Sequence, residues 1–188
     1  MSHAFLTKTE ATSTYTLPLT IGKGSVIDFE TTGVPGRDAN HEIITLGYLC
    51  RDKLTVIQRN SPDKTPYYTR LSETFNSIPR PFYAYNSSFE RDVIRLELGI
   101  EILDQDFVDL MAPWKQKAME NGLKWPRLDE LISEPEDYFQ RDKVTGREVP
   151  LLWKQFLEDQ RSERPLEMIV KHCASDVLRE ATLLLRYQ

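Results

Sequence analysis

The pattern of apolar and polar positions predicts strands mainly in the first half of the chain and helices mainly in the second. Short apolar runs bounded by turn residues are typical of strands. Such runs cover residues 25–29, 43–49, 54–58, 81–85 and 107–110. Cys50, Arg51 and Asp52 separate the second run from the third, and this short interval predicts a β-hairpin.

Apolar residues at intervals of three and four predict helices. The predicted helices cover residues 69–78, 88–98, 111–121, 128–132, 149–157 and a long stretch from Pro165. In the last of these, a stripe that includes Leu166, Cys173, Val177 and Leu184 marks the face expected to lie on the core. The fold class predicted from this order is α/β or α+β, with one mixed sheet covered by helices.

A single domain is expected. Residues 1–24 are polar and rich in threonine, so they form either an N-terminal tail or an extra edge strand. Residues 25–188 then form the domain itself, and the chain of 188 residues with 40% apolar residues has the size and composition of one globular unit.

Net charge, cysteine content and hydropathy limit the function classes. The net charge of −5 argues against nonspecific capture of nucleic acid by a basic surface. It leaves nucleic acid open as a substrate, because an enzyme that binds divalent cations with clustered carboxylates is itself acidic. Cys50 and Cys173 are too few for a disulfide framework. With no bilayer-length apolar run and no secretory leader, we expect a cytoplasmic protein without membrane contact.

Asp28 and Glu30 are the first candidates for chemistry. They stand two residues apart at the end of a predicted strand, so alternation sends both side chains to one face. Two carboxylates there repel each other unless a cation joins them, and Mg²⁺ or Mn²⁺ suits such oxygen ligands. The alternative is a solvated strand end.

Two further segments carry polar groups at the edges of elements. Asn86 to Glu90 joins a strand to a helix, and a glutamate in a first helical turn is often only a dipole partner. His172 and Asp176 lie one turn apart on the long C-terminal helix. The histidine could accept a proton while the aspartate binds metal, or the two could form an ordinary ion pair.

Basic and aromatic residues mix between residues 114 and 147. The mixture comprises Lys115, Lys117, Lys124, Arg141, Lys143 and Arg147, with Trp114 and Trp125. Such mixtures can bind single-stranded nucleic acid. The favoured alternative is that the tryptophans pack in the core and the lysines are solvated. The acidic cluster of Glu134, Glu136 and Asp137 is interpreted as a solvated loop.

Taken in order, the three segments resemble the signatures of the DEDD superfamily of 3′-to-5′ exonucleases, which have a ribonuclease H-like fold. Asp28 to Thr31 is similar to the first motif, Asn86 to Glu90 to the second and His172 to Asp176 to the third. Residues 145–153 and Asp109 resemble the YprB-like branch. The resemblance runs from about residue 25 to residue 187 and implies a five-stranded mixed sheet, an antiparallel hairpin plus parallel strands, flanked by helices.

The sequence departs from the family pattern at two places. Glu90 stands where an aspartate is usual, which moves the carboxylate by about one methylene and makes Asp92 and Asp109 fallback ligands. Three residues separate His172 from Asp176, whereas four are common in the histidine-type branch.

The resemblance implies a metal-dependent nuclease that releases nucleoside monophosphates from single-stranded DNA or RNA. Its implied metal ligands, which would hold two divalent cations, Mg²⁺ or Mn²⁺, are Asp28, Glu30, Glu90 and Asp176. His172 is the implied base, and Thr31, Asn86 and Phe89 are the implied contacts of the terminal nucleotide.

Three other functions remain open. The first is a structure-specific endonuclease of the same fold, because a fold hosts more than one activity. The second is a catalytically silent module that binds nucleic acid or acts as a scaffold. The third is a plain acidic interaction domain in which all three segments are caps and solvated charges.

Overall fold

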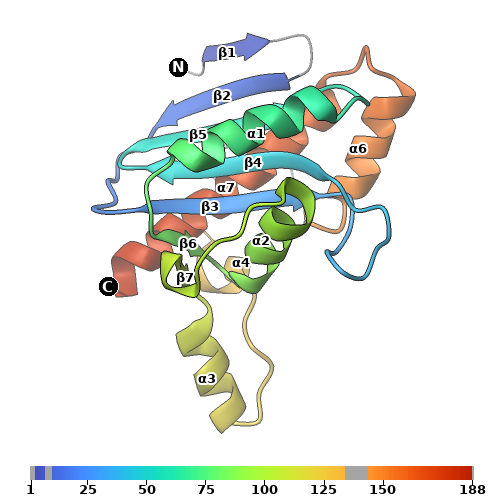
Figure 1. Cartoon of the computed structure of the whole chain (residues 1–188). Helices are drawn as coiled ribbons and strands as arrows, with labels where there is room; N and C mark the ends of the chain where they lie inside the picture. Colours follow the sequence, from blue (N-terminus) through green and yellow to red (C-terminus); the bar gives the residue numbers. More distant parts are fainter. Residues whose placement is uncertain (1–2, 7–9, 134–143, 188) are drawn as a thin grey trace.

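The computed structural model describes residues 3–6, 10–133 and 144–187. Its strands form one seven-stranded sheet in the order β1-β2-β5-β4-β3-β6-β7 (Figure 1). The strands are β1 (His3–Leu6), β2 (Glu10–Thr16), β3 (Ser25–Thr31), β4 (Ile43–Cys50), β5 (Lys53–Arg59), β6 (Phe82–Ala84) and β7 (Phe107–Asp109). β3 pairs antiparallel with β4 and parallel with β6, which in turn pairs parallel with β7. The sheet is therefore mixed.

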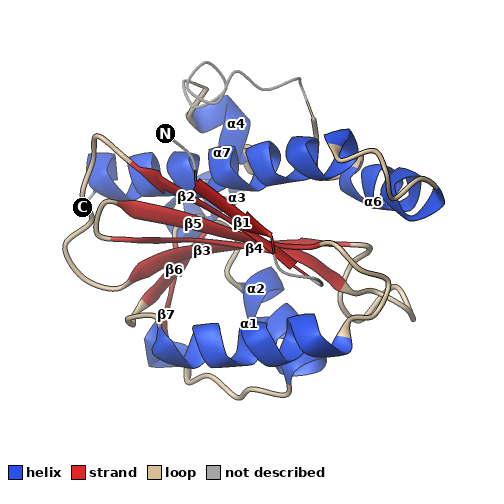
Figure 2. Cartoon of the chain, turned by 90° about the horizontal axis from the view of Figure 1, so that it is seen from above, coloured by secondary structure: helices blue, strands red, loops and turns tan. Residues whose placement is uncertain are grey.

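Helices cover both faces of this sheet. They are α1 (Thr65–Ser77), α2 (Ser88–Val93), α3 (Ala112–Glu120), α4 (Leu128–Leu131), α6 (Val149–Glu158) and α7 (Arg164–Tyr187). A π-helical turn, η1 (Ile94–Leu98), continues α2, and a 3₁₀ turn, η2 (Asp104–Asp106), precedes β7. Figure 2 shows α4, α6 and α7 on one side of the sheet and α1 and α2 on the other. The predicted mixed sheet flanked by helices is confirmed.

The sheet has more strands than the predicted five. Those five correspond to β3 to β7, including the β4–β5 hairpin whose turn contains Arg51 at φ 57°. Residues 3–6 and 10–16 supply the other two, because β2 pairs antiparallel with β5 along its whole length and β1 pairs with β2. The chain thus hydrogen-bonds the outer edge of β5 with its own N-terminal strands.

α7 lies across the centre of the sheet. Its apolar stripe, which includes Cys173, Val177 and Ala181, packs with Val26 and Leu49 in one buried cluster. The helix lies close to the sheet at Gly47 of β4, where an added Cβ would lie 2.5 Å from Cys173 Sγ. The missing side chain at this glycine therefore sets how near α7 lies to β3 and β4.

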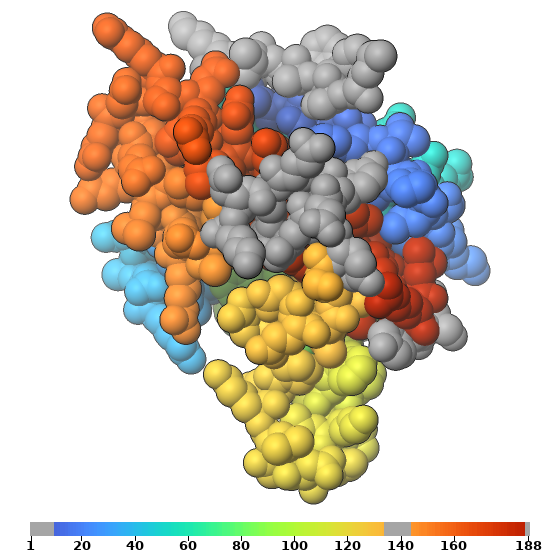
Figure 3. All heavy atoms as spheres, turned by 180° about the vertical axis from the view of Figure 1, so that it is seen from behind, coloured from blue at the N-terminus to red at the C-terminus, as the bar shows by residue number. Residues whose placement is uncertain are grey.

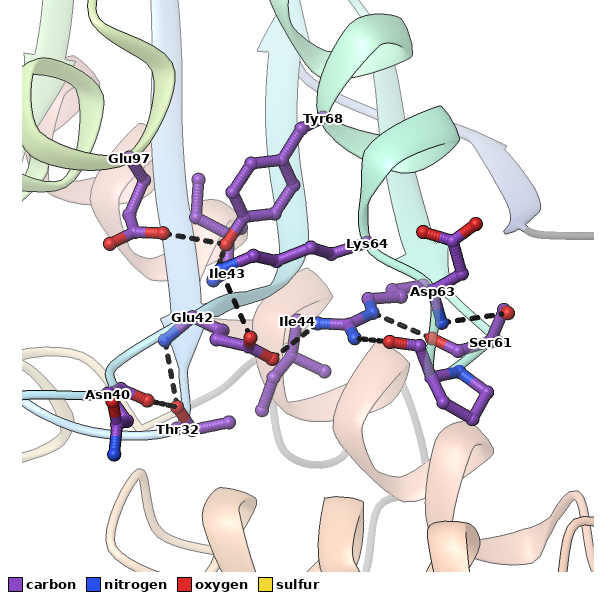
Figure 4. A network of polar contacts seen from close by, with 12 residues as sticks. Thr32, Asn40, Glu42, Ile43, Ile44, Ser61, Asp63, Lys64, Tyr68 and Glu97 are labelled. Carbon is purple, nitrogen blue, oxygen red and sulfur yellow. Dashed lines mark hydrogen bonds and ion pairs between the residues drawn. The ribbon is translucent and has the colours of Figure 1, made fainter.

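The opposite face of the sheet packs against α1 and α2. Ile27 and Phe29 of β3 join Leu71 and Phe75 of α1 there, and Val93 of α2 completes the contact. A polar network at the edge of this layer ties the loop after β3 to α1 (Figure 4). In it, Glu42 Oε2 accepts a 2.8 Å hydrogen bond from Arg59, and Tyr68 accepts one of 2.8 Å from the Ile43 amide.

α3 and the segment that leads from it to α4 extend beyond the sheet as an arm, residues 112–127 (Figures 1 and 3). Met119, Leu123 and Trp125 are exposed on this arm. Among the described residues, no helix is both long enough and apolar enough to span a membrane.

Candidate metal centre and active site

β3 carries two carboxylates to the face that α7 covers. Ile27 and Phe29 point into the core under α1, while Val26 packs with α7 on the other face. Asp28 and Glu30 alternate with Ile27 and Phe29, so they share the α7 side. Strand alternation alone therefore explains why both acids meet the same helix.

α7 supplies three more functional groups along one side. His172, Asp176 and Glu180 follow each other at intervals of four residues, which places them on neighbouring turns. The apolar residues between them, such as Cys173 and Val177, pack on the sheet. The same contact that forms the core thus brings these polar side chains to the end of β3.

Glu30, His172 and Asp176 form the outer group of the site. His172 Nε2 lies 3.4 Å from Glu30 Oε1 and 3.6 Å from Asp176 Oδ2. One ligand atom from each of these residues lies within 4.8 Å of the other two, a spacing that could hold a metal ion. The other oxygen of Asp176 pairs with the guanidinium of Arg179. This ion pair fixes the direction of the Asp176 carboxylate.

Asp28, Glu90 and Glu180 form the inner group. Glu90 and Glu180 are only 3% and 2% exposed. Burial raises the pKa of Asp28 to about 8, and the charge of Asp176 adds to the rise. Burial also raises the pKa values of Glu90 and Glu180 well above their usual range, and the charge of Asp28 raises both further. Three carboxyls with interacting charges are therefore buried together.

The inner group fits divalent cations. Within the described residues, Asp28 Oδ2, Glu90 Oε2 and Glu180 Oε2 are buried and have no hydrogen-bond partner. Burying an unpaired carboxylate is costly, so such oxygens call for a proton or a cation. A set made of carboxylate oxygens, with an imidazole nearby, suits Mg²⁺ or Mn²⁺. The residues present are therefore suitable ligands for the metal ions that the sequence predicts.

Asp109 is held by hydrogen bonds. Its Oδ1 accepts from the amides of Asn86, at 3.1 Å, and Met111, at 2.9 Å. Its Oδ2 pairs with Lys115 Nζ at 3.1 Å, and the same ammonium donates to Asn86 Oδ1 at 3.2 Å. Both oxygens are thus engaged, and Asp109 fixes the turn that follows β6, which includes Asn86 at φ 70°.

The other sequence candidates lie at different depths. Asp92 is on the surface and pairs with Arg95 at 3.0 Å, away from the inner group. Thr31 is buried and donates to the Gly33 carbonyl at 2.5 Å. Phe89 is partly buried and packs against the α1 core. Of the two fallback ligands, the structure therefore places only Asp109 beside Glu90, where its charge raises the Glu90 pKa.

A cavity of about 170 Å³ opens beside the outer group. Its lining includes His172 and Asp176 together with Thr145 and Gly146, so the segment 145–153 begins next to the histidine. A Cβ on Gly146 would lie 3.8 Å from His172 Nε2. The far end of this segment, at Trp153 of α6, is buried in the core between α6 and α7.

The basic and aromatic mixture divides between the arm and other parts of the chain. Trp125 is 48% exposed, which corrects the expectation that it packs in the core; Trp114 is half-buried. Lys115 Nζ lies 5.5 Å from the centre of the Trp125 ring. The remaining residues of interest, Arg141, Lys143, Glu134, Glu136 and Asp137, lie outside the described residues.

Sequence reasoning missed Glu180 and Arg179. The position of Glu180 four residues after Asp176 is a readable signal, because it continues the row that starts at His172. Arg179 gave none, because an arginine on a helix is usually solvated. Here it is buried, and its Nε donates to the Ile132 carbonyl at 3.0 Å.

Comparison with known proteins identifies the family of the chain. No curated protein matches the chain. The family model of the RNase H superfamily matches residues 26–187. Nucleases of this kind use divalent metal ions, and Asp28, Glu30 and Asp176 form an acidic cluster where such ions could bind. With most of its length matched, the chain belongs to the RNase H superfamily.

Proposed function

We propose that the protein is a 3′-to-5′ exonuclease that hydrolyses single-stranded DNA or RNA and releases nucleoside monophosphates. The observation that carries this proposal is the grouping of Glu30, His172 and Asp176 at the end of β3, with their ligand atoms within 4.8 Å of one another. A proton acceptor beside clustered carboxylates is the arrangement that metal-assisted hydrolysis of a phosphodiester needs.

Asp28, Glu30, Glu90 and Asp176 are the proposed metal ligands. When bound, two divalent cations would activate water and stabilise the oxygens that attack and leave a phosphodiester. The role of the protein is to hold the carboxylates in place before substrate arrives. Arg179 does so for Asp176 through its ion pair, and the packing of α7 on Gly47 does so for the helix as a whole.

His172 is the proposed general base. Its Nε2 faces the oxygens of Glu30 and Asp176, which would stabilise the imidazolium that forms when the ring takes a proton. At 5% exposure the residue is shielded from bulk water, yet it lines the cavity beside the site. A water molecule in that cavity is therefore the proposed source of the proton.

The order of the motifs supports assignment to the DEDD exonucleases and their YprB-like branch. The first motif lies on β3, the second follows β6 and the third lies on α7. The pairing of β3 with β6 and the packing of α7 over both bring these three segments together. Glu90 departs from the usual aspartate, but it is buried and its charge interacts with that of Asp28.

The arm supports a single-stranded substrate. Trp125 offers an exposed aromatic ring, and Lys115 links that ring to Asn86 and Asp109 at the edge of the site. Aromatic side chains stack on unpaired bases without regard to sequence. We therefore place the path of the strand over the arm, with its 3′ end toward Asn86, Thr31 and the exposed part of Phe89.

A cleavage assay tests the proposed function. The full chain is incubated with 5′-labelled single strands of DNA and RNA in Mn²⁺, in Mg²⁺ and in EDTA, with Asp28→Asn as the inactive control and Asp92→Asn as the matched surface control. A metal-dependent ladder that shortens from the 3′ end, and that only Asp28→Asn abolishes, is expected. Internal fragments from the start would instead indicate an endonuclease. No cleavage together with no Mn²⁺ binding would indicate a silent binding module.

A further inference from the structure

Glu180 is buried at the inner end of the site. One oxygen, Oε1, accepts a 2.8 Å hydrogen bond from the amide of Tyr85, directly after β6. The other oxygen, Oε2, is buried and has no hydrogen-bond partner among the described residues. The hydrogen bond to Oε1 thus fixes the carboxylate, and its second oxygen is buried without a partner to satisfy it.

The residues around Glu180 are acidic. The charges of Asp28 and Glu90 act on it, and Asp176 lies one helical turn earlier on α7. The nearby cations form their ion pairs with other acids, Arg179 with Asp176 and Lys115 with Asp109, although the charge of Lys115 also acts on Glu90 and lowers its pKa. The three carboxyls of the inner group can therefore ionise together only if a bound cation offsets their charge.

A proton alone accounts poorly for Glu180. A neutral glutamic acid would carry its hydrogen on Oε2, because Oε1 already accepts from Tyr85. That hydroxyl would need an acceptor, and the described residues offer none within hydrogen-bond reach. Glu90 Oε2 is likewise buried and has no hydrogen-bond partner among the described residues.

We propose that Glu180 is a metal ligand which, together with Asp28 and Glu90, binds a cation deeper in the protein than the cation held by Glu30 and Asp176. This inference rests on the metal binding that the proposed function requires. It adds a fifth carboxylate, from outside the sequence motifs, to the four implied by the resemblance.

Calorimetric titration of the metal-free full chain with Mn²⁺ tests the inference without any assay of catalysis. Glu180→Gln is the informative variant, because the amide oxygen can still accept from Tyr85 while the charge is lost. Glu167→Gln is the matched control, because it makes the same change at an exposed position on the same helix. Circular dichroism of each variant verifies the fold.

We expect Glu180→Gln to bind one Mn²⁺ fewer per chain than the wild type, or to bind it at least about tenfold more weakly, and Glu167→Gln to match the wild type. Glu90→Gln is a second variant, and it is expected to lose the same ion. The double variant, Glu90→Gln with Glu180→Gln, should therefore lose no more Mn²⁺ than either single variant. Unchanged stoichiometry and affinity in Glu180→Gln would overturn the inference and leave the proposed function standing. Absence of Mn²⁺ binding in the wild type would overturn both.

Discussion

His172 Nε2 lies 3.4 Å from Glu30 Oε1, although the two residues are 142 positions apart in the sequence. β3 provides the glutamate and α7 provides the histidine, and the packing of the helix on the strand brings them together. The two residues can have different roles in the site, because Glu30 can bind a cation while His172 can accept a proton.

Replacement of His172 by alanine is expected to lower the rate of cleavage by about 100-fold or more, because general-base contributions are typically of this size. Mn²⁺ binding by the inner group should be retained. Single-turnover cleavage and calorimetry check the two halves of this prediction. His41→Ala is the matched control, because that histidine also pairs with a glutamate, at 3.0 Å, but in the loop before β4. Unchanged turnover in His172→Ala would show that another group takes the proton.

The stability of the metal-free protein is expected to fall as the pH rises toward 8. The pKa of Asp28 is raised from 3.8 to about 8, so between these values the folded state keeps a proton that the unfolded state releases. The free energy of unfolding then falls with increasing pH, by at most about 1.4 kcal/mol per pH unit for one proton. Above pH 8 this contribution levels off. Thermal unfolding in EDTA at several pH values measures it.

Asp28→Asn should flatten part of this dependence, because it removes the titrating carboxyl. Added Mn²⁺ should reverse the trend for the wild type, since cations bind the ionised form and binding to the folded state stabilises it. A wild-type curve in EDTA that is no steeper than that of Asp28→Asn would contradict the prediction.

Gly47→Ala is expected to destabilise the fold by about 1–3 kcal/mol and to reduce metal binding, because the added methyl group would press on Cys173 and Val177. α7 would have to move away from β4, and its polar residues would move with it. Denaturant unfolding and Mn²⁺ titration check both effects. Gly22→Ala is the control, since nothing lies within 4 Å of the Cβ it would add.

Trp125→Ala is expected to weaken binding of a single strand by about tenfold, in keeping with about 1–3 kcal/mol for one stacked base. Fluorescence anisotropy with a labelled oligonucleotide measures this, in the Asp28→Asn background so that the strand stays intact. Leu151→Ala removes an exposed apolar side chain from α6, outside the arm, and should bind as before. Equal affinities for the Trp125 and Leu151 variants would remove the arm from the strand path.

The sequence predicts the central part of the fold well. The elements from β3 to α7 lie within a few residues of the predicted ranges, because each has a clear apolar period. Asp28 and Glu30 share a face for the same reason. The first strands are harder to predict, because β2 is polar and gains its structure from pairing with β5 and not from an apolar pattern.

The functional groups that the sequence leaves uncertain are those defined by tertiary contacts. Neither the engagement of both Asp109 oxygens nor the ion pair of Arg179 with Asp176 can be read from local spacing. Burial of Glu90 is equally a property of the assembled layers. Its position in a first helical turn is also consistent with a simple dipole partner, and only the proximity of Asp28 distinguishes the two interpretations.

The apolar stripe of α7 and its polar row of His172, Asp176 and Glu180 depend on the same helical periodicity. Each residue advances the helix by about 100°, so steps of four turn the row of His172, Asp176 and Glu180 by only about 40° at a time, over about 12 Å of helix. A single inserted residue between Cys173 and Asp176 would rotate everything after it by about 100°. The polar row would then be broken and Val177 would leave the core in the same event. We therefore expect substitutions on this stretch of the helix to be tolerated more readily than any change in its length.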